Sequence, residues 1–404
     1  MMRRHTIPAA AAALGLVGVL TAAQVAPAAA GPPQDDLDAA VLEEQLAAFA
    51  ELTGGSALAE VRDGGESWSD AAGLRSLEDG ARPARPGDRV RIGSVTKSMV
   101  AAIVLQLDGE GELDLDDPIG DHLPGLLPYE EDPTIRQLLQ HTAGVPDWVA
   151  VAYPGLDEGD LTGLREDYQN HYRPEELVAI GTGETPPFDP GEGWSYSNTG
   201  YVVLGLLIEE RTGHTLRHEL RERIFEPAGL DDTYLPRPDS NGIRGAHSVP
   251  YVSTGDPDEP YFDVTEVSNS QLGASGGVVS TVHDVNDFYT ALTDGTLLTA
   301  AQLAEATRFI DTGTGFDYGL GLGGVRLDCP GAPGQLFIGH VGDGMGHQTQ
   351  TFHSLDGEHR ITLSWNIDDK HGYTDPAAFG QALNDLLTAG LCGTGTGTGT
   401  DTDA

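Results

Sequence analysis

The sequence predicts an α/β protein: an antiparallel sheet flanked by the two terminal helices, with a mostly helical domain inserted between its strands. Three observations predict this fold class. Residues 37–72 have the pattern of a helix and a β-hairpin, and residues 335–390 that of three strands and a helix. Residues 98–310 are rich in loops and in apolar residues at helical spacing. The two ends are therefore expected to build one α/β domain, with the middle as its insertion.

The first elements are a helix over 37–52 and two strands over 56–62 and 66–72. Leucines and a phenylalanine in the first segment recur at i, i+4 and i+7, which places them on one helix face. The two strands flank Asp63 and two glycines, a sequence typical of a tight hairpin turn.

The last elements are three strands and a helix. Asp356 and the glycine after it are expected to join the last two strands. Asp375 and Pro376 are typical of a helix start, and the helical spacing continues to about Gly390. Residues 393–404, a Gly-Thr repeat with Asp, are expected to form a disordered tail because they cannot bury apolar area. The strands are expected at 335–341, 347–355 and 358–367.

Residues 1–30 have the layout of a secretory signal. A basic start with Arg3 and Arg4 precedes an apolar stretch and then three alanines that end at Ala30. This order predicts cleavage before Gly31 and a secreted protein. No other apolar run approaches the roughly 20 residues that cross a bilayer, so stable membrane insertion is not expected.

The chain is strongly acidic. It has 22 Lys and Arg against 63 Asp and Glu, a formal charge of −41. Cleavage after residue 30 removes two arginines and no acid, so the mature chain carries −43. Such a charge repels nucleic acids and anionic bilayers, which argues against both as partners. The acidity fits adaptation to high salt, and it also fits a genome that favours Arg over Lys; only Lys97 and Lys370 are lysines.

The two cysteines, Cys329 and Cys392, are expected to form a disulfide in a secreted chain. The bridge would close a loop of 64 residues, which contributes about 4 kcal/mol when it constrains the unfolded chain. A pair of buried thiols is the alternative. Neither cysteine lies near a candidate base in the sequence, so a thiol nucleophile is not expected.

Ser94 and Lys97 are the strongest candidates for chemistry. Apolar residues downstream recur on one helix face, so a helix is expected to begin near Ser94 and to place both side chains on one side. A serine hydroxyl becomes a good nucleophile when a base takes its proton, and burial can keep a lysine amine neutral for that purpose. The structural alternative is a serine that caps the helix and a solvated lysine.

Two further segments carry polar residues at a loop tip and at a strand end. Tyr196 and Asn198 precede an apolar helix, and a phenol can relay a proton while an amide can hold a substrate carbonyl. His340, Gly342 and Asp343 end the first C-terminal strand, where glycine permits close approach of a substrate and the Asp343 N–H is a candidate oxyanion donor. For each segment alone, a packing role is the alternative.

These three segments, in this order, resemble the serine β-lactamase and penicillin-binding DD-peptidase superfamily. The similar branch holds class C β-lactamases, serine D-alanyl-D-alanine carboxypeptidases, and related esterases and D-aminopeptidases. The resemblance spans about 37–390, within a hydrolase domain expected at 31–392. It implies a site in the cleft between the sheet and the helical domain, with no cofactor. Other stretches that resemble the family lie at 111–118, 134–146, 229–233 and 276–281.

The resemblance implies a role for each residue. Ser94 is the acylated nucleophile, and Lys97 and Tyr196 share the proton transfers. Asn198 positions the substrate amide. The backbone N–H groups of Ser94 and Asp343 form the oxyanion hole.

The third motif bears on the substrate. His340 stands where β-lactamases have lysine and the carboxypeptidase branch has histidine, which favours a D-alanyl-D-alanine carboxypeptidase acting on cell-wall peptides. However, Val341 and Asp343 stand where relatives that grip a terminal carboxylate have hydroxyls, and the Asp343 carboxylate would repel such a group. Arg326 is a candidate to compensate. Esterase, D-aminopeptidase and class C-like β-lactamase activity are therefore alternatives.

Other classes of function are weaker. Ser275 lies in a Gly-x-Ser-x-Gly pattern, but the segment before it is too polar for the buried strand of a nucleophile elbow. A non-catalytic module that binds cell-wall peptides is disfavoured because all candidate catalytic residues are intact. We expect a monomer that acts on a small peptide, ester or β-lactam. No metal site is expected, since the spacing is unconvincing both for His214, His218 and Glu219 and for His340, His347 and His353.

Overall fold

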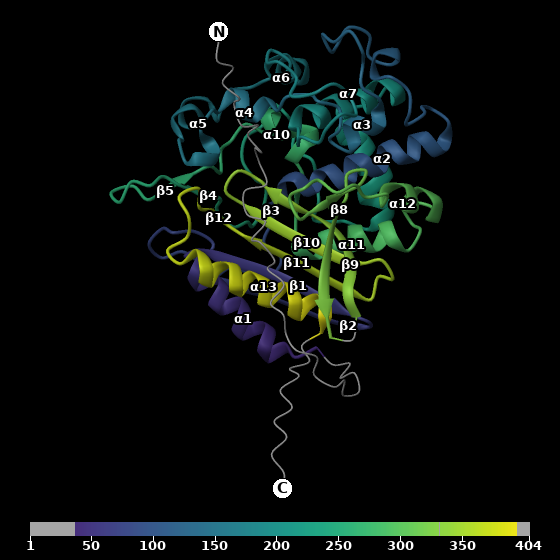
Figure 1. The fold of residues 1–404 in the computed structure, drawn as a ribbon. Coiled ribbons are helices and arrows are strands. Elements are labelled where there is room, and N and C mark those ends of the chain that lie inside the picture. The colour runs from purple at the N-terminus through teal and green to yellow at the C-terminus, as the bar shows by residue number, and fades with distance from the viewer. Residues whose placement is uncertain (1–36, 331, 394–404) are drawn as a thin grey trace, which may run out of the picture.

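In the computed structural model of the chain, which describes residues 37–330 and 332–393, one seven-stranded antiparallel sheet organises the fold (Figure 1). Its strand order is β2-β1-β11-β10-β9-β8-β7, so the two N-terminal strands meet the C-terminal strands at the β1–β11 pair. The predicted fold class is confirmed. The strands are β1 (Ser56–Asp63), β2 (Glu66–Gly73), β7 (Asp317–Tyr318), β8 (Gly323–Cys329), β9 (Ala332–Asp343), β10 (Gln348–Ser354) and β11 (His359–Trp365).

The terminal helices α1 (Ala39–Thr53) and α13 (Pro376–Cys392) lie side by side on one face of this sheet (Figure 1). The buried Phe49 ring of α1 lies 5.3 Å from the Trp365 ring of β11 and 5.3 Å from the Phe379 ring of α13. These contacts pack both ends of the chain into one core, because three aromatic rings bury a large apolar area together.

Most helices lie between β2 and β7 in the sequence and above the other face of the sheet (Figure 1). Among the described residues, no helix is both long and apolar enough to span a membrane. The helices are α2 (Thr96–Glu110), α3 (Ile135–Leu139), α4 (Trp148–Ala152), α5 (Thr162–Asp167), α6 (Pro174–Gly181), α7 (Asn198–Thr212), α8 (Leu216–Leu220), α9 (Glu226–Ala228), α10 (Asn269–Gly276), α11 (Val282–Thr293) and α12 (Ala300–Ala306). This region also holds β3 (Val90–Arg91), which pairs with β6 (Val279–Ser280), and β4 (Tyr251–Ser253), which pairs with β5 (Tyr261–Asp263).

The third C-terminal strand is shorter than predicted. It ends at Trp365, and β12 (Ile367–Asp368) leaves the sheet to pair in parallel with β4. Asn366 lies where the chain changes direction. Its side chain accepts a hydrogen bond from the Ser56 N–H at 2.7 Å and donates one to the Val249 carbonyl at 2.8 Å. The prediction of one strand over 358–367 is wrong at this point, because the Asn366 side-chain oxygen takes the Ser56 N–H while the Asn366 carbonyl accepts from the Tyr251 N–H of β4 instead.

Strand β8 was not predicted. Its buried residues Val325, Leu327 and Cys329 alternate with exposed Arg326 and Asp328, which is the pattern of a strand with one buried face. The two glycines at its start interrupt the apolar run. The alternation is the signal that identifies this strand in the sequence.

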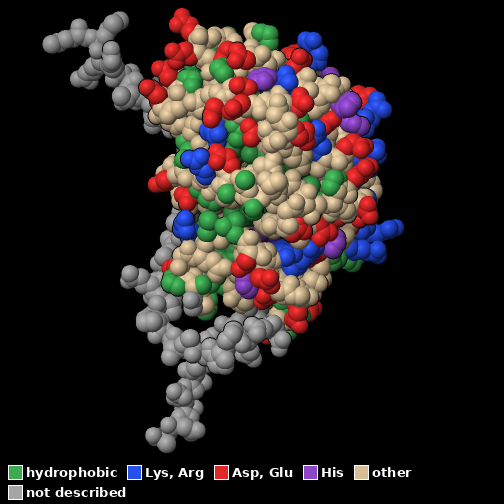
Figure 2. All heavy atoms as spheres, turned by 90° about the vertical axis from the view of Figure 1, so that its right-hand side faces the viewer, with side chains coloured by type: hydrophobic (Ala, Val, Ile, Leu, Met, Phe, Trp, Pro, Cys, Tyr) green, Lys and Arg blue, Asp and Glu red, His purple; other side chains and the backbone are tan. Residues whose placement is uncertain are grey.

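Acidic side chains are common on the described surface. Figure 2 shows them at many places on one face, with basic ones among them, while hydrophobic side chains gather to the left of its centre. Many arginines form ion pairs with these acidic side chains. Arg223 contacts both Glu110 and Glu219, and Arg136 contacts Asp116 and Glu305. The predicted signal peptide and nearly all of the predicted tail lie outside the described residues.

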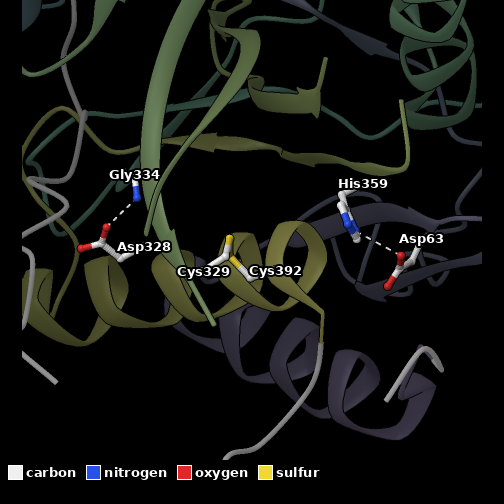
Figure 3. Close-up of a disulfide and its surroundings, with 6 residues drawn as sticks. All are labelled: Asp63, Asp328, Cys329, Gly334, His359 and Cys392. Atoms are coloured by element: carbon white, nitrogen blue, oxygen red, sulfur yellow. Dashed lines mark hydrogen bonds and ion pairs between the residues drawn. A yellow bond between two sulfur atoms is a disulfide. The ribbon is translucent and has the colours of Figure 1, made fainter. Parts of the chain in front are cut away.

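Cys329 and Cys392 are paired, with Cα atoms 5.0 Å apart (Figure 3). The first cysteine ends β8 and the second is the last residue of α13. The pair therefore ties the C-terminal helix to the sheet.

A mature protein without free thiols is expected from this pairing. Mass spectrometry of the unreduced, alkylated protein should find Cys329 and Cys392 in one linked peptide, and reduction should lower the melting temperature, because a bridge over 64 residues contributes about 4 kcal/mol. Two alkylated cysteines in the unreduced protein would contradict the expectation.

Candidate active site

Ser94 lies in a short 3-10 turn, Gly93–Val95, that leads directly into α2. Gly93 has φ 54°, and a Cβ there would lie 2.4 Å from the Asp343 carbonyl carbon. A Cβ at Gly342 would lie 3.3 Å from the Ser94 nitrogen. Both glycines are needed because the end of β9 passes directly against the backbone at Ser94.

Lys97 lies one helical turn after Ser94 and is completely buried. Its Nζ lies 2.9 Å from Ser94 Oγ, 2.8 Å from Asn198 Oδ1 and 2.6 Å from the Ser275 carbonyl oxygen. Three elements, α2, α7 and α10, therefore meet at one amine.

The protonation state of Lys97 decides whether its amine can accept the Ser94 proton. Burial lowers the pKa of the amine to about 7, against the opposing charge of Asp147. A neutral amine has two N–H donors and one lone pair. The donors are taken by the oxygens of Asn198 and Ser275, so the lone pair faces Ser94 and can accept its proton.

Tyr196 approaches Ser94 from the other side, and its hydroxyl lies 2.7 Å from Ser94 Oγ. Burial raises the pKa of Tyr196 well above its usual range, so the phenol stays protonated at neutral pH. The Lys97 Nζ lies 4.7 Å from the centre of the Tyr196 ring. Nucleophile, amine and phenol thus form one hydrogen-bonded set that can move a proton in either direction.

His141 holds the Tyr196 loop and was missed by the sequence reasoning. Its ring lies 4.3 Å from the Tyr196 ring, its Nδ1 accepts a hydrogen bond from the Ser197 N–H, and its carbonyl accepts one from the Ser195 N–H. It also has φ 61°, a left-handed conformation that is rare for a residue with a side chain. The sequence feature that could have identified His141 is its position inside the stretch 134–146, which resembles the family.

Asn198 is oriented by a second missed residue, Asp147. The Asn198 amide nitrogen donates to Asp147 Oδ2 at 2.9 Å, and its backbone N–H donates to Oδ1 at 3.3 Å. This leaves the Asn198 oxygen facing Lys97. Asp147 directly follows the stretch 134–146, but nothing in its spacing marks it as a partner of a residue 51 positions later.

The residues of the third motif, His340, Gly342 and Asp343, do not all lie at the pocket. Gly342 and Asp343 line the pocket beside Ser94. His340 is fully buried behind this wall, where its Nε2 lies 2.8 Å from the Tyr318 hydroxyl, and burial lowers its pKa to about 3. Arg326 lies on the exposed face of β8, outside the pocket lining, so it does not compensate the charge of Asp343.

The compensating cation is Lys370, the second lysine of the chain. Its Nζ lies 3.0 Å from Asp343 Oδ2 and 2.8 Å from Asp368 Oδ2. Lys370 follows β12, so the departure of the chain from the main sheet brings it to the pocket rim.

The pocket lies between the end of β9 and the helical region. Ser94, Tyr196 and Asn198 line it, and apolar residues cover much of the remaining wall. The apolar surface favours a ligand with a hydrophobic part, and the polar groups converge on one point, as expected for a site of chemistry. The apolar members of the lining are Trp148, Val149, Leu156, Leu272, Val341, Met345 and Trp365.

The side chains of the alternative nucleophile and metal sites considered in the sequence are bound to other residues of the protein. The Ser275 hydroxyl donates to the Leu272 carbonyl at 2.8 Å, inside α10 rather than at a strand end. Ligand atoms of His214, His218 and Glu219 lie within 4.8 Å of one another, but the Glu219 carboxylate also binds Arg223 at 2.6 Å. The histidines of the second set bind Tyr318, Ser248 and Thr351 respectively.

A comparison with protein families identifies the family of this chain. The family described as Beta-lactamase matches residues 42–384, which is most of the chain. The chain belongs to the beta-lactamase family. The predicted resemblance is confirmed.

Relatives of this beta-lactamase family member include several hydrolases. A solved D-stereospecific amidohydrolase from Streptomyces sp. is 32% identical with a TM-score of 0.75, covering 89% of this chain and all of that one. Penicillin-binding protein 4* from Bacillus subtilis is 28% identical over 70% of this chain and 61% of its own length. A D-aminopeptidase from Cereibacter sphaeroides is 27% identical over 88% of this chain and 63% of its own. The chain thus spans about three fifths of these two curated relatives.

The pH dependence of hydrolysis should report the state of Lys97. With a substrate that carries no ionisable group, kcat/KM is expected to rise with pH through about 7 and then level off, because only the neutral amine can accept the Ser94 proton. Lys97→Arg should lose activity by roughly 10²- to 10⁴-fold, since a guanidinium stays protonated.

The control for this profile is Asp368→Asn, because burial raises the pKa of Asp368 to about 7 as well. This variant is expected to keep the rising limb. If the rise of kcat/KM with pH disappeared in Asp368→Asn, the titrating group would be Asp368 and not Lys97. A wild-type kcat/KM that is flat between about pH 5 and pH 9 would also contradict the assignment to Lys97.

Proposed function

We propose that this protein is a serine amidohydrolase that cleaves small amides or peptides through an acyl-enzyme on Ser94. The observation that carries the proposal is the placement of Ser94 Oγ 2.9 Å from a buried lysine amine and 2.7 Å from a protonated phenol. The similarity to an amidohydrolase and a D-aminopeptidase supports amides as the substrate class.

The first step is acylation. Neutral Lys97 takes the Ser94 proton as Oγ bonds to the carbonyl carbon, and the carbonyl oxygen becomes an oxyanion. The backbone at Ser94 and the end of β9 lie against each other, so the N–H groups of Ser94 and Asp343 are the proposed donors to that oxyanion. Asn198 keeps Lys97 in place through its side-chain oxygen.

The second step releases the amine. The Tyr196 hydroxyl donates its proton to the leaving nitrogen as the carbonyl re-forms and the C–N bond breaks, and the proton held by Lys97 returns to the Tyr196 oxygen, which leaves Ser94 esterified. A water molecule then attacks the ester carbonyl and gives a proton to the same pair. Ser94 leaves with that proton, and the acid product is free.

Carboxypeptidase activity on D-alanyl-D-alanine cell-wall peptides, which the sequence favoured, is the second candidate. Similarity to penicillin-binding protein 4* supports it. The same site also suits a short-chain ester or a β-lactam. Export after cleavage at Ala30 is part of the proposal and rests on the sequence alone; N-terminal sequencing of the exported protein tests it. The expected monomer has no support in the comparisons.

A four-substrate panel tests the proposal: a D-amino-acid amide, an acyl-D-Ala-D-Ala peptide, nitrocefin and a short-chain ester. The wild type is expected to hydrolyse the amide, and Ser94→Ala to lose every activity of the wild type by about 10³-fold or more.

The matched control is Ser67→Ala, which removes an exposed serine from β2 and should leave all rates unchanged. Turnover that persists in Ser94→Ala would refute the nucleophile. Turnover of the peptide but not the amide would favour the carboxypeptidase.

A further inference from the structure

We propose that Asp147 is a positioning residue for the reaction at Ser94. Its carboxylate fixes the direction in which Lys97 offers its lone pair, and its charge sets the pH range in which Ser94 is activated. Asp147 acts through the Asn198 side chain, which is hydrogen-bonded to both Asp147 and Lys97. The inference rests on the proposed function, because Ser94 and Lys97 are the nucleophile and the base of that proposal.

The Asn198 amide is the part of this arrangement that can turn round. Its oxygen and its NH2 group have nearly the same shape, so either could face Lys97. The other acceptor of Lys97, the Ser275 carbonyl at 2.6 Å, belongs to the backbone of α10 and has no such freedom. In the structure the Asn198 oxygen faces Lys97 at 2.8 Å. The group that holds the amide this way round therefore determines where the Lys97 lone pair points.

Asp147 holds the amide in this direction because an ionised carboxylate only accepts hydrogen bonds. Its Oδ1 accepts the Val149 N–H at 3.1 Å and the Asn198 backbone N–H at 3.3 Å. Its Oδ2 accepts the Asn198 side-chain nitrogen at 2.9 Å. Only the nitrogen end of the amide can face such a group, so the oxygen end is directed at Lys97.

The carboxylate itself is held in one place. Asp147 is only 8% exposed, and a buried charge is costly unless it is hydrogen-bonded. Burial raises the pKa of Asp147, while the donors of Val149 and Asn198 and the charge of Lys97 oppose that rise. The bond from the Val149 N–H also caps the start of α4, which ties the side chain to a helix.

Asp147 is also the charged group that acts on Lys97. Its negative charge opposes the effect of burial on the pKa of the amine. The other titratable side chains around the amine are neutral at neutral pH, because burial raises the pKa of two phenols and lowers the pKa of two imidazoles: Tyr196, Tyr201, His141 and His340. Removal of the Asp147 charge should therefore lower the pKa of Lys97.

Asp147→Asn separates this role from a role in folding. The variant keeps the size of the side chain, and its oxygen must stay where the Val149 and Asn198 backbone N–H groups donate. The new NH2 group then takes the place of Oδ2 and meets the NH2 group of Asn198. Two donors cannot bond to each other, so the Asn198 amide turns and presents its nitrogen to Lys97. The lone pair of Lys97 is then drawn to that donor and away from Ser94.

The experiment measures the rate at which a fluorophosphonate labels Ser94 between about pH 5 and pH 9. This probe reports the nucleophile for any substrate class, since Ser94 Oγ displaces fluoride while Lys97 takes the proton. In Asp147→Asn the highest rate is expected to fall roughly 10- to 100-fold, as for a misplaced general base. The midpoint of the rise with pH should move below that of the wild type, and the melting temperature should stay close to it. A purely structural defect would lower the rate without that shift.

The exchanged pair Asp147→Asn/Asn198→Asp provides the rescue. The new amide can donate to the new carboxylate, whose second oxygen then faces Lys97 as an acceptor. Asn198→Asp alone should also be slow, because two carboxylates oppose each other. The double variant is expected to label at least about tenfold faster than Asp147→Asn, with its midpoint above that of the wild type, because the negative charge now lies against the amine.

The matched control is Asp160→Asn. Asp160 is an exposed aspartate that accepts the N–H of Thr162, two positions on, as Asp147 accepts that of Val149, and its replacement should leave the labelling rate unchanged. An Asp147→Asn variant labelled at the wild-type rate, or a double variant no faster than it, would overturn the inference and leave the proposed nucleophile standing. A wild type that is not labelled at Ser94 would overturn the proposed function and this inference with it.

Discussion

The candidate site depends on one lysine amine that is kept away from water. Burial lowers the pKa of Lys97 to about 7 in spite of the opposing charge of Asp147, so a large share of the amine is neutral near neutral pH. The Tyr196 and Tyr201 rings lie with their centres 4.7 and 5.4 Å from Lys97 Nζ. Val100, Ala101 and Val104 of the same helix belong to the buried apolar core of the helical region. The helical region is therefore more than a cover for the sheet, because its packing keeps water from the amine that the proposed nucleophile Ser94 requires.

A second constraint is the contact between the two parts of the fold. The Ser94 backbone belongs to the helical region and Asp343 to the sheet, yet glycines on both sides allow the two backbones to touch. This contact fixes the nucleophile against the strand end that carries the proposed oxyanion donor. The order of the sheet matters for the same reason: β9 is placed by β10 and β8, which pair with it on either side.

Local patterns in the sequence were sufficient for much of this structure. The first helix and the hairpin follow from periodicity and turn chemistry, and Ser94 and Lys97 from their spacing on one helix. Tyr196 and Asn198 were joined to them through the resemblance to a family. Long-range partners were not accessible in that way. Asp147, His141 and Lys370 act through neighbours 51, 56 and 27 positions away, and such pairs are set by the tertiary fold. His340 was misplaced relative to the pocket because a strand motif does not reveal which face is covered, and here Tyr318 covers it.

The scarcity of lysine has a practical consequence for anyone who handles this protein. The whole sequence offers two side-chain amines, one fully buried beneath Ser94 and the other only 14% exposed between two carboxylates that raise its pKa and keep it protonated. Reagents that couple to unprotonated amines, such as activated-ester dyes and amine-reactive resins, therefore find almost nothing to react with except the amino terminus. The protein can be tethered or labelled at a single end by ordinary amine chemistry, with its pocket left open.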